Sequence, residues 1–72
     1  MFDELMELVS KYTEIDRNEI DKDTSIFDEL GYNSYEFMCL LEDIEDELGV
    51  YITDIEVENV RTIGDILALV ER

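Results

Sequence analysis

Apolar residues between positions 37 and 48 recur at the spacing of one helix face, and this pattern limits the fold more than any other feature of the chain. At about 100° per residue their side chains fall within an arc of roughly 100°. They are Phe37, Leu40, Leu41, Ile44 and Leu48. Gly49 follows, a residue type that often ends helices. Asn33 and Glu36 have the spacing of a capping box, which predicts a helix with Ser34 in its first turn.

The same two signals predict three further helices. The first covers residues 2–12, with apolar residues on one face at Phe2, Leu5, Met6 and Val9. Thr53 and Glu56 repeat the capping spacing before a short helix near residues 54–59. Thr62 and Asp65 repeat it before a last helix of about ten residues, whose apolar face is Ile63, Ile66, Leu67 and Val70.

No stretch of the chain shows the sustained alternation of a strand. The predicted fold is therefore all-α: a small four-helix bundle in one domain, residues 1–72, with a short third helix. The connection over residues 13–33 is unusually long, which indicates a function or a hidden turn of helix. We expect its apolar residues to fasten it to the core: Ile15, Ile20, Ile26, Phe27 and Leu30.

Charge excludes several classes of function. The chain has 21 acidic residues, 5 basic residues and no histidine, a formal charge of −16. Nucleic acid and anionic membrane surfaces would be repelled. The single cysteine rules out a disulfide framework, and the lack of histidine removes the usual general base and zinc ligand. With no basic leader and no apolar run of membrane-spanning length, we expect a soluble, cytoplasmic protein. The small size of the chain and the missing general base favour a non-catalytic role.

Acidic helical proteins include calcium-binding EF-hands, but residues 21–32 lack key residues of an EF-hand calcium loop. Residues 21–25 begin like a calcium loop, but Ile26 occupies the glycine position and Tyr32 the place of the bidentate glutamate. No specific metal site is predicted. Loose divalent binding along residues 42–47 or 54–58 is expected to relieve repulsion between carboxylates.

The most informative segment is the glycine turn at Gly31, which delivers Ser34 to the start of the best-defined helix. A hydroxyl there lies near the positive end of the helix dipole and within reach of another enzyme. No histidine and no neighbouring lysine can activate it as a nucleophile. Ser34 therefore indicates a modification site. Its spacing alone, however, favours a serine that merely caps the helix.

The stretch from Leu30 to Phe37 resembles the prosthetic-group site of the acyl carrier protein family, whose hallmark is Gly-x-Asp-Ser-Leu at the start of the second helix. This chain differs at Asn33 and Tyr35, where the family has Asp and Leu. The resemblance covers nearly the whole chain, and a start at Met1 is similar to a free-standing carrier. Further similar segments follow the family's order: Ser25 to Gly31, Glu42 to Glu47, Gly49 to Ile52 and Val60 to Ile63.

The resemblance implies that Ser34 accepts 4′-phosphopantetheine from coenzyme A, transferred by a magnesium-dependent phosphopantetheinyl transferase. The thiol would then hold acyl groups as thioesters and carry them between enzymes of fatty acid, polyketide or related biosynthesis. The implied partners are acyl-loading enzymes, ketosynthases and similar enzymes with basic docking surfaces, met by a monomeric carrier. An aminoacyl or peptidyl carrier is an alternative, as is an acidic interaction module of the same fold without the prosthetic group.

Opposite the buried stripe, the second helix carries a candidate partner surface. Tyr35 and Met38 provide apolar contacts within an acidic rim that would attract basic enzymes. A solvated face with scattered hydrophobic residues explains the same pattern. Cys39 is expected to be half-exposed and unreactive. The candidate residues are Asn33, Tyr35, Glu36, Met38, Cys39, Glu42, Asp43, Asp46 and Glu47.

Overall fold

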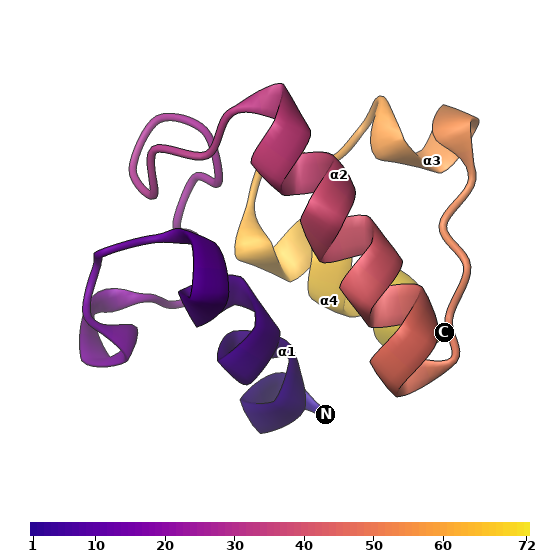
Figure 1. Cartoon of the computed structure of the whole chain (residues 1–72), viewed down its shortest axis with the longest axis horizontal. Coiled ribbons are helices and arrows are strands. Elements are labelled where there is room, and N and C mark those ends of the chain that lie inside the picture. The colour runs from indigo at the N-terminus through magenta and orange to yellow at the C-terminus, as the bar shows by residue number, and fades with distance from the viewer.

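The computed structural model describes residues 1–72 as four α-helices with no strand (Figure 1). Helix α1 covers Phe2–Val9 and continues into a 3-10 turn, η1, at Ser10–Tyr12. Helix α2 covers Ser34–Asp43 and continues into a wider π turn, η3, at Ile44–Leu48. Helices α3 and α4 cover Asp54–Val57 and Ile63–Glu71. The predicted all-α fold with a short third helix is confirmed. None of these helices combines the length and apolar character needed to cross a membrane.

All three predicted capping boxes are present, at the starts of α2, α3 and α4. The long second helix ends at Gly49, as predicted. The prediction for the third helix was wrong at its end, because α3 stops at Val57 instead of residue 59. Beyond it the amides of Asn59 and Val60 bond to carbonyls three residues back, at 3.2 and 3.1 Å, so the chain tightens into a turn.

One apolar cluster forms the core, with α4 lying behind α2 in the view of Figure 1. The predicted stripe of α2 faces this cluster: Phe37, Leu40 and Ile44 are buried, while Leu41 and Leu48 are half-buried at its edge. Helix α1 contributes buried Leu5, Met6, Leu8 and Val9, and α4 contributes its whole predicted apolar face. The fold is therefore held by three amphipathic helices that share one small core.

The long connection contains the hidden turn that its length suggested, a 3-10 turn, η2, at Arg17–Glu19. Ile20, Ile26 and Leu30 are buried as expected. The prediction was wrong for Ile15 and Phe27, which are exposed. Phe27 lies in the turn that follows the buried Ile26. Its ring packs against Phe37 at the edge of the core, with ring centroids 5.3 Å apart. The polar Thr13 side chain fastens the chain near Ile15, since its hydroxyl donates to the Leu30 carbonyl at 2.8 Å.

Backbone hydrogen bonds join the long connection to the start of α4. The amide of Ile26 donates to the Arg61 carbonyl at 3.0 Å, and the amide of Ile63 donates to the Thr24 carbonyl at 3.0 Å. The amide of Gly64 donates to the Lys22 carbonyl at 2.8 Å, and a Cβ at Gly64 would lie only 3.0 Å from that oxygen. Glycine is required here because the two backbones meet closely.

A polar clamp ties the end of α1 to the middle of the long second helix. The Tyr12 hydroxyl and the Lys11 ammonium both donate to Asp43 Oδ2, at 2.5 and 3.0 Å. Beside them the Tyr32 hydroxyl donates to the Val9 carbonyl at 2.6 Å. The hydrogen bond from Tyr12, followed by that from Lys11, lowers the pKa of Asp43 below its ordinary value of 3.8. The ionised carboxylate is therefore bound more strongly in the folded state.

This clamp predicts a specific loss of stability in acid. Because the folded-state pKa of Asp43 is depressed, its contribution is present above pH 3.8 and is lost as the pH falls through the folded-state pKa. The free energy of unfolding of wild type should exceed that of Asp43→Asn near neutral pH, and the difference should shrink below pH 3.8. Urea titrations at a series of pH values measure this. Asp46→Asn controls for the loss of one charge, and a difference that does not vary with pH would contradict the assignment.

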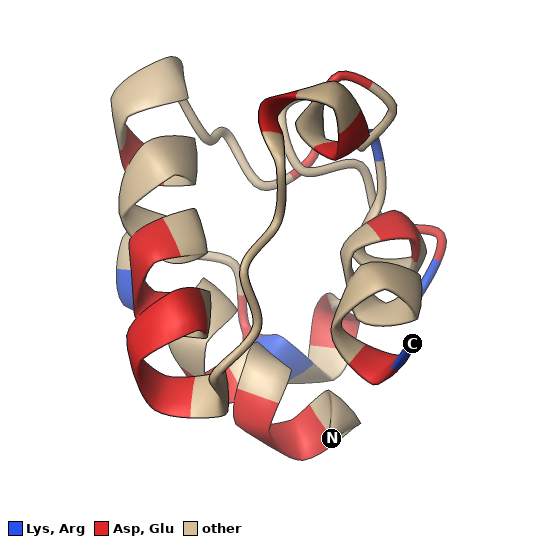
Figure 2. Cartoon of the chain, turned by 90° about the vertical axis from the view of Figure 1, so that its right-hand side faces the viewer, with Lys and Arg blue, Asp and Glu red and all other residues tan.

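Acidic residues are spread over all four helices, with a dense run along the end of α2 and through η3 (Figure 2). Five of the residues from 42 to 47 are acidic, and all of these except Asp43 are exposed. No group of three or more His, Cys, Asp or Glu side chains is arranged to hold a metal ion. Any divalent effect would thus come from loose association with this surface.

We expect magnesium or calcium to raise the melting temperature of the protein. Divalent ions that associate with the folded surface relieve repulsion between its carboxylates and stabilise it by mass action. Thermal unfolding followed by circular dichroism, with sodium chloride at the same ionic strength as the control, measures the effect. Equal melting temperatures in the two salts would show that only general screening acts.

Candidate functional site

Ser34 is presented by a turn whose residues alternate between exposed and buried positions. Gly31 has a φ of +74°, a left-handed conformation that favours glycine. Tyr32 then enters the core, with its amide bonded to the Ile26 carbonyl at 3.2 Å. Phe37 is buried one turn into α2. Because buried aromatic residues lie on both sides of Ser34, the position of its backbone is fixed by the core.

The helix cap at this site is Asn33, and Ser34 is the first helical residue. Asn33 Oδ1 accepts from the Glu36 amide at 2.7 Å, and Glu36 Oε1 accepts from the Asn33 amide at 3.1 Å. This is the reciprocal box that the spacing predicted. Ser34 is exposed, and its hydroxyl takes part in none of the side-chain hydrogen bonds of the structure. The capping explanation for Ser34 is therefore wrong, and its hydroxyl is free to react.

The surroundings of Ser34 suit a phosphate ester and do not suit hydrolysis. The free amides at the start of α2 and the positive end of its dipole favour a negative group. The chain has no histidine, and Lys11 is engaged by Asp43. Without a base of its own, Ser34 can accept a group only when another protein removes its proton. The exposed hydroxyl at a helix start fits the attachment of 4′-phosphopantetheine.

The face of α2 next to Ser34 carries exposed apolar side chains with acidic neighbours. Tyr35 and Met38 are 77% and 52% exposed, on the side opposite the core. Glu42, Asp46 and Glu47 are also exposed. Cys39 is half-buried, as expected, and its side chain raises the pKa of Tyr35, one turn before it. The structure thus places Glu42 beside the apolar part of the predicted surface, while Glu47 lies near Glu4, Glu7 and Leu8 of α1.

Three of the candidate partner residues have intramolecular roles. The side chains of Asn33 and Glu36 form the capping box. Asp43 is half-buried and holds Tyr12 and Lys11. Its carboxylate is directed toward α1, so it does not belong to the free acidic rim.

Residues after the long second helix extend this surface and were not among the candidates from the sequence. Tyr51 and Ile55 are strongly exposed, while Ile52 between them is buried. A cavity of about 120 Å³ lies between this segment and α2, starting at Met38, one turn beyond Ser34. Its lining residues are Met38, Leu41, Glu42, Glu45, Tyr51, Ile52 and Asp54. The available signal was the apolar run at residues 50–52, in which a buried Ile52 forces its extended neighbour Tyr51 outward.

Known proteins resemble this chain along nearly its whole length. The family described as "Phosphopantetheine attachment site" matches residues 3–70. A protein named "Acyl carrier protein" from Thermotoga maritima is 28% identical over 72 residues, which are 100% of this chain and 89% of the relative. One of the same name from Exiguobacterium sibiricum is 34% identical over 68 residues, which are 94% of this chain and 86% of the relative.

A solved structure gives the same result for the fold. It is described as an acyl carrier protein from Mycobacterium tuberculosis and matches with a TM-score of 0.88, over 97% of this chain and 93% of its own. At 24% identity the likeness concerns the fold alone. Together with the matched family, it confirms the resemblance that the segments around Ser34 predicted.

The capping geometry predicts opposite results for two neighbouring substitutions. Asn33→Ala removes the acceptor for the Glu36 amide and should lower the free energy of unfolding by about 1 kcal/mol. Ser34→Ala removes a hydroxyl without a hydrogen-bond partner from an exposed position, so its effect should stay within about 0.5 kcal/mol. Urea denaturation of both variants measures this. A larger loss for Ser34→Ala than for Asn33→Ala would return the capping role to the serine.

Proposed function

We propose that this chain, which belongs to the acyl carrier protein family, carries its 4′-phosphopantetheine on Ser34. Proteins of this family are non-catalytic carriers, and phosphopantetheine is their cofactor. The observation that carries the assignment to Ser34 is its exposed hydroxyl at the first position of α2, left free because Asn33 provides the cap. When bound, the group supplies a thiol that holds an acyl group as a thioester.

The attachment reaction follows from the groups at the site. Ser34 Oγ forms a bond to the phosphorus that carries pantetheine in coenzyme A, and the bond from that phosphorus to the bridging oxygen of the pyrophosphate breaks. Adenosine 3′,5′-bisphosphate leaves. The hydroxyl proton passes to a base of the transferase, because this chain has no histidine and Lys11 is held by Asp43. The start of α2 then stabilises the negative phosphodiester.

Partner enzymes are proposed to dock on the exposed face that begins beside Ser34. Tyr35 and Met38 supply apolar contacts, and Glu42 and Asp46 supply negative charge that steers basic surfaces. The transferase and the enzymes that load and use the acyl group would share this face. Tyr51 and Ile55 widen it toward α3. Asp43 is omitted from the docking surface because it is bound to Tyr12 and Lys11.

The proposed cargo is an acyl intermediate of fatty acid, polyketide or related biosynthesis in the cytoplasm. The relatives named above are acyl carrier proteins, which favours an acyl over an aminoacyl cargo. The cavity between α2 and residues 51–54 opens one turn from Ser34 and has apolar walls at Met38, Leu41 and Ile52. It offers a shallow place for the first part of an acyl chain.

Intact-mass spectrometry tests the assignment to Ser34. After incubation with coenzyme A, magnesium and a broad-specificity phosphopantetheinyl transferase, the wild-type mass should increase by one phosphopantetheinyl group. Ser34→Ala should not change in mass. Ser10→Ala, which alters a half-buried serine away from the site, should be modified like wild type.

Two further results bear on the proposal. Asn33→Asp restores the residue typical of the family next to the serine, and it should be modified at least as fast as wild type. If several transferases leave the folded wild type unmodified, the interaction module without a prosthetic group becomes the better description. Modification of Ser34→Ala would move the attachment site to another residue.

A further inference from the structure

The segment that covers the cavity beside α2 is weakly anchored by its own side chains. Within residues 50–57 only Ile52 is buried, and Val50 and Val57 pack partly against the core. Helix α3 has four residues, none of them buried, and Ile55 at its start is 76% exposed. So short a helix is not stable alone. Its position must therefore depend on contacts from elsewhere in the chain.

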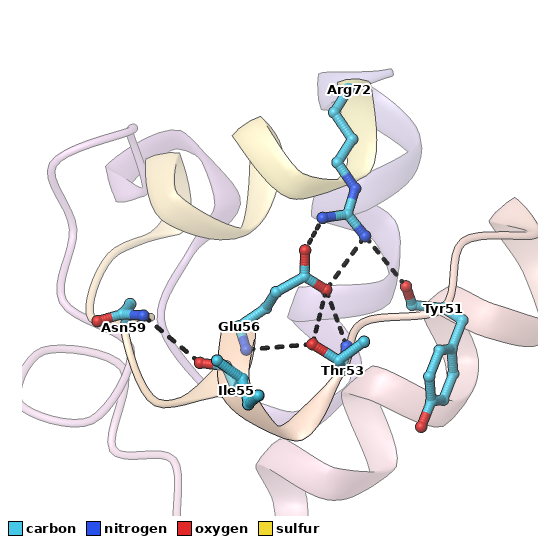
Figure 3. Close-up of polar contacts among 6 residues, drawn as sticks. All are labelled: Tyr51, Thr53, Ile55, Glu56, Asn59 and Arg72. Carbon is cyan, nitrogen blue, oxygen red and sulfur yellow. Dashed lines mark hydrogen bonds and ion pairs between the residues drawn. The ribbon is translucent and has the colours of Figure 1, made fainter.

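Arg72, which follows α4, provides such a contact at both ends of this segment (Figure 3). Its Nη2 donates to the Tyr51 carbonyl at 3.4 Å and to Glu56 Oε1 at 3.1 Å. Its Nη1 also forms an ion pair with Glu56 Oε2. The planar guanidinium thus engages both carboxylate oxygens and a backbone carbonyl, a geometry that a lysine ammonium does not reproduce.

The carboxylate that binds Arg72 also organises α3. Glu56 Oε1 accepts from the Thr53 amide at 2.9 Å, and the Glu56 amide donates to Thr53 Oγ1 at 3.2 Å, which forms the capping box of the helix. Glu56 Oε1 also accepts from the Thr53 hydroxyl at 3.0 Å. The other hydrogen bonds of residues 50–57 stay within the segment or join it to the turn that follows it. Arg72, which follows α4, is therefore the side chain from outside residues 50–60 that holds this segment by polar contacts.

The same segment forms one wall of the cavity of about 120 Å³. Tyr51, Ile52 and Asp54 face Met38 and Leu41 of α2 across it. Release of the segment would widen the cavity, because the long second helix buries Phe37, Leu40 and Ile44, whereas Ile52 is the one buried side chain of residues 50–57.

We propose that Arg72 is a positioning residue that holds residues 50–57 over this cavity and so determines how far an acyl chain attached through Ser34 is covered. The part concerning the acyl chain rests on the proposed function. The side chains of Arg72 and Glu56 are 49% and 23% exposed, so their ion pair is weak enough to open and is sensitive to salt.

Hydrogen exchange of the unmodified protein tests the structural part without any prosthetic group. In Arg72→Ala, amides of residues 50–60 should exchange about two- to five-fold faster at low salt, the range given by loss of one exposed ion pair. Amides of α1 and α2 should be unchanged. Arg72→Lys keeps the positive charge but loses the planar guanidinium, so exchange of residues 50–60 should be faster than in wild type and slower than in Arg72→Ala. In about 1 M sodium chloride, the exchange rates of residues 50–60 in wild type should approach those of Arg72→Ala, because salt screens the ion pair.

Arg17→Ala is the matched control. It removes an exposed arginine whose Nη2 lies 2.7 Å from Asp3 Oδ1, on α1 and away from α3. It makes the same change in net charge, and exchange over residues 50–60 should match wild type. Equal exchange in this segment for Arg72→Ala and wild type would overturn the proposal.

Cleavage of a bound thioester tests the part that concerns cargo. When the attached thiol carries an eight-carbon acyl group, hydroxylamine should cleave this thioester about two- to five-fold faster in Arg72→Ala than in wild type or Arg17→Ala. An acetyl group, too short to reach the cavity, should be cleaved at one rate in all three. Equal eight-carbon rates would overturn the role in covering cargo. Failure to load Ser34 in wild type would overturn the proposed function and leave the exchange result intact.

Discussion

Burial of one face of the long second helix is the interaction on which the rest of this structure depends. Phe37, Leu40 and Ile44 pack into a core shared with α1 and α4, in a chain with a formal charge of −16. Repulsion among the carboxylates opposes compaction, and a domain of this size has little apolar area to offset it. The acidic residues therefore lie outside the core, and the opposite face of α2 is left free for Tyr35, Met38 and Glu42.

The sequence allowed the helices to be predicted because their signals are local. The three capping boxes depend on residues three apart, and the apolar face of each long helix depends on spacing within that helix. Contacts between distant segments were not predictable in this way. Ile15 and Phe27 are apolar yet exposed. Phe27 lies next to the residues through which the long connection meets the start of α4, and Ile15 follows Thr13, whose hydroxyl donates to the Leu30 carbonyl. Asp43 looks like any other member of the acidic run, but Tyr12, distant in sequence, turns it inward.

The same distinction between local signals and long-range contacts applies to the candidate site. Ser34 could be identified from its neighbours, because a glycine turn and a capping box fix the start of one helix. Its freedom to react could be decided only from the backbone and hydrogen bonds, which show that Asn33 is the cap. The contributions of Tyr51, Ile55 and Arg72 were missed because each depends on where α3 lies. Local sequence thus places the candidate serine, and tertiary contacts complete the surface around it.

The hydrogen bond of Asn33 also shows what changes when asparagine replaces the aspartate that is usual in the family. Asn33 Oδ1 is committed to the Glu36 amide, so an aspartate there would keep a second carboxylate oxygen free beside Ser34. Asn33 presents an amide nitrogen in that place, which cannot bind a cation and does not repel a phosphate. The cap is thus preserved while one negative charge beside Ser34 is absent. The proposed transferase would therefore have to hold its magnesium ion without a carboxylate from residue 33.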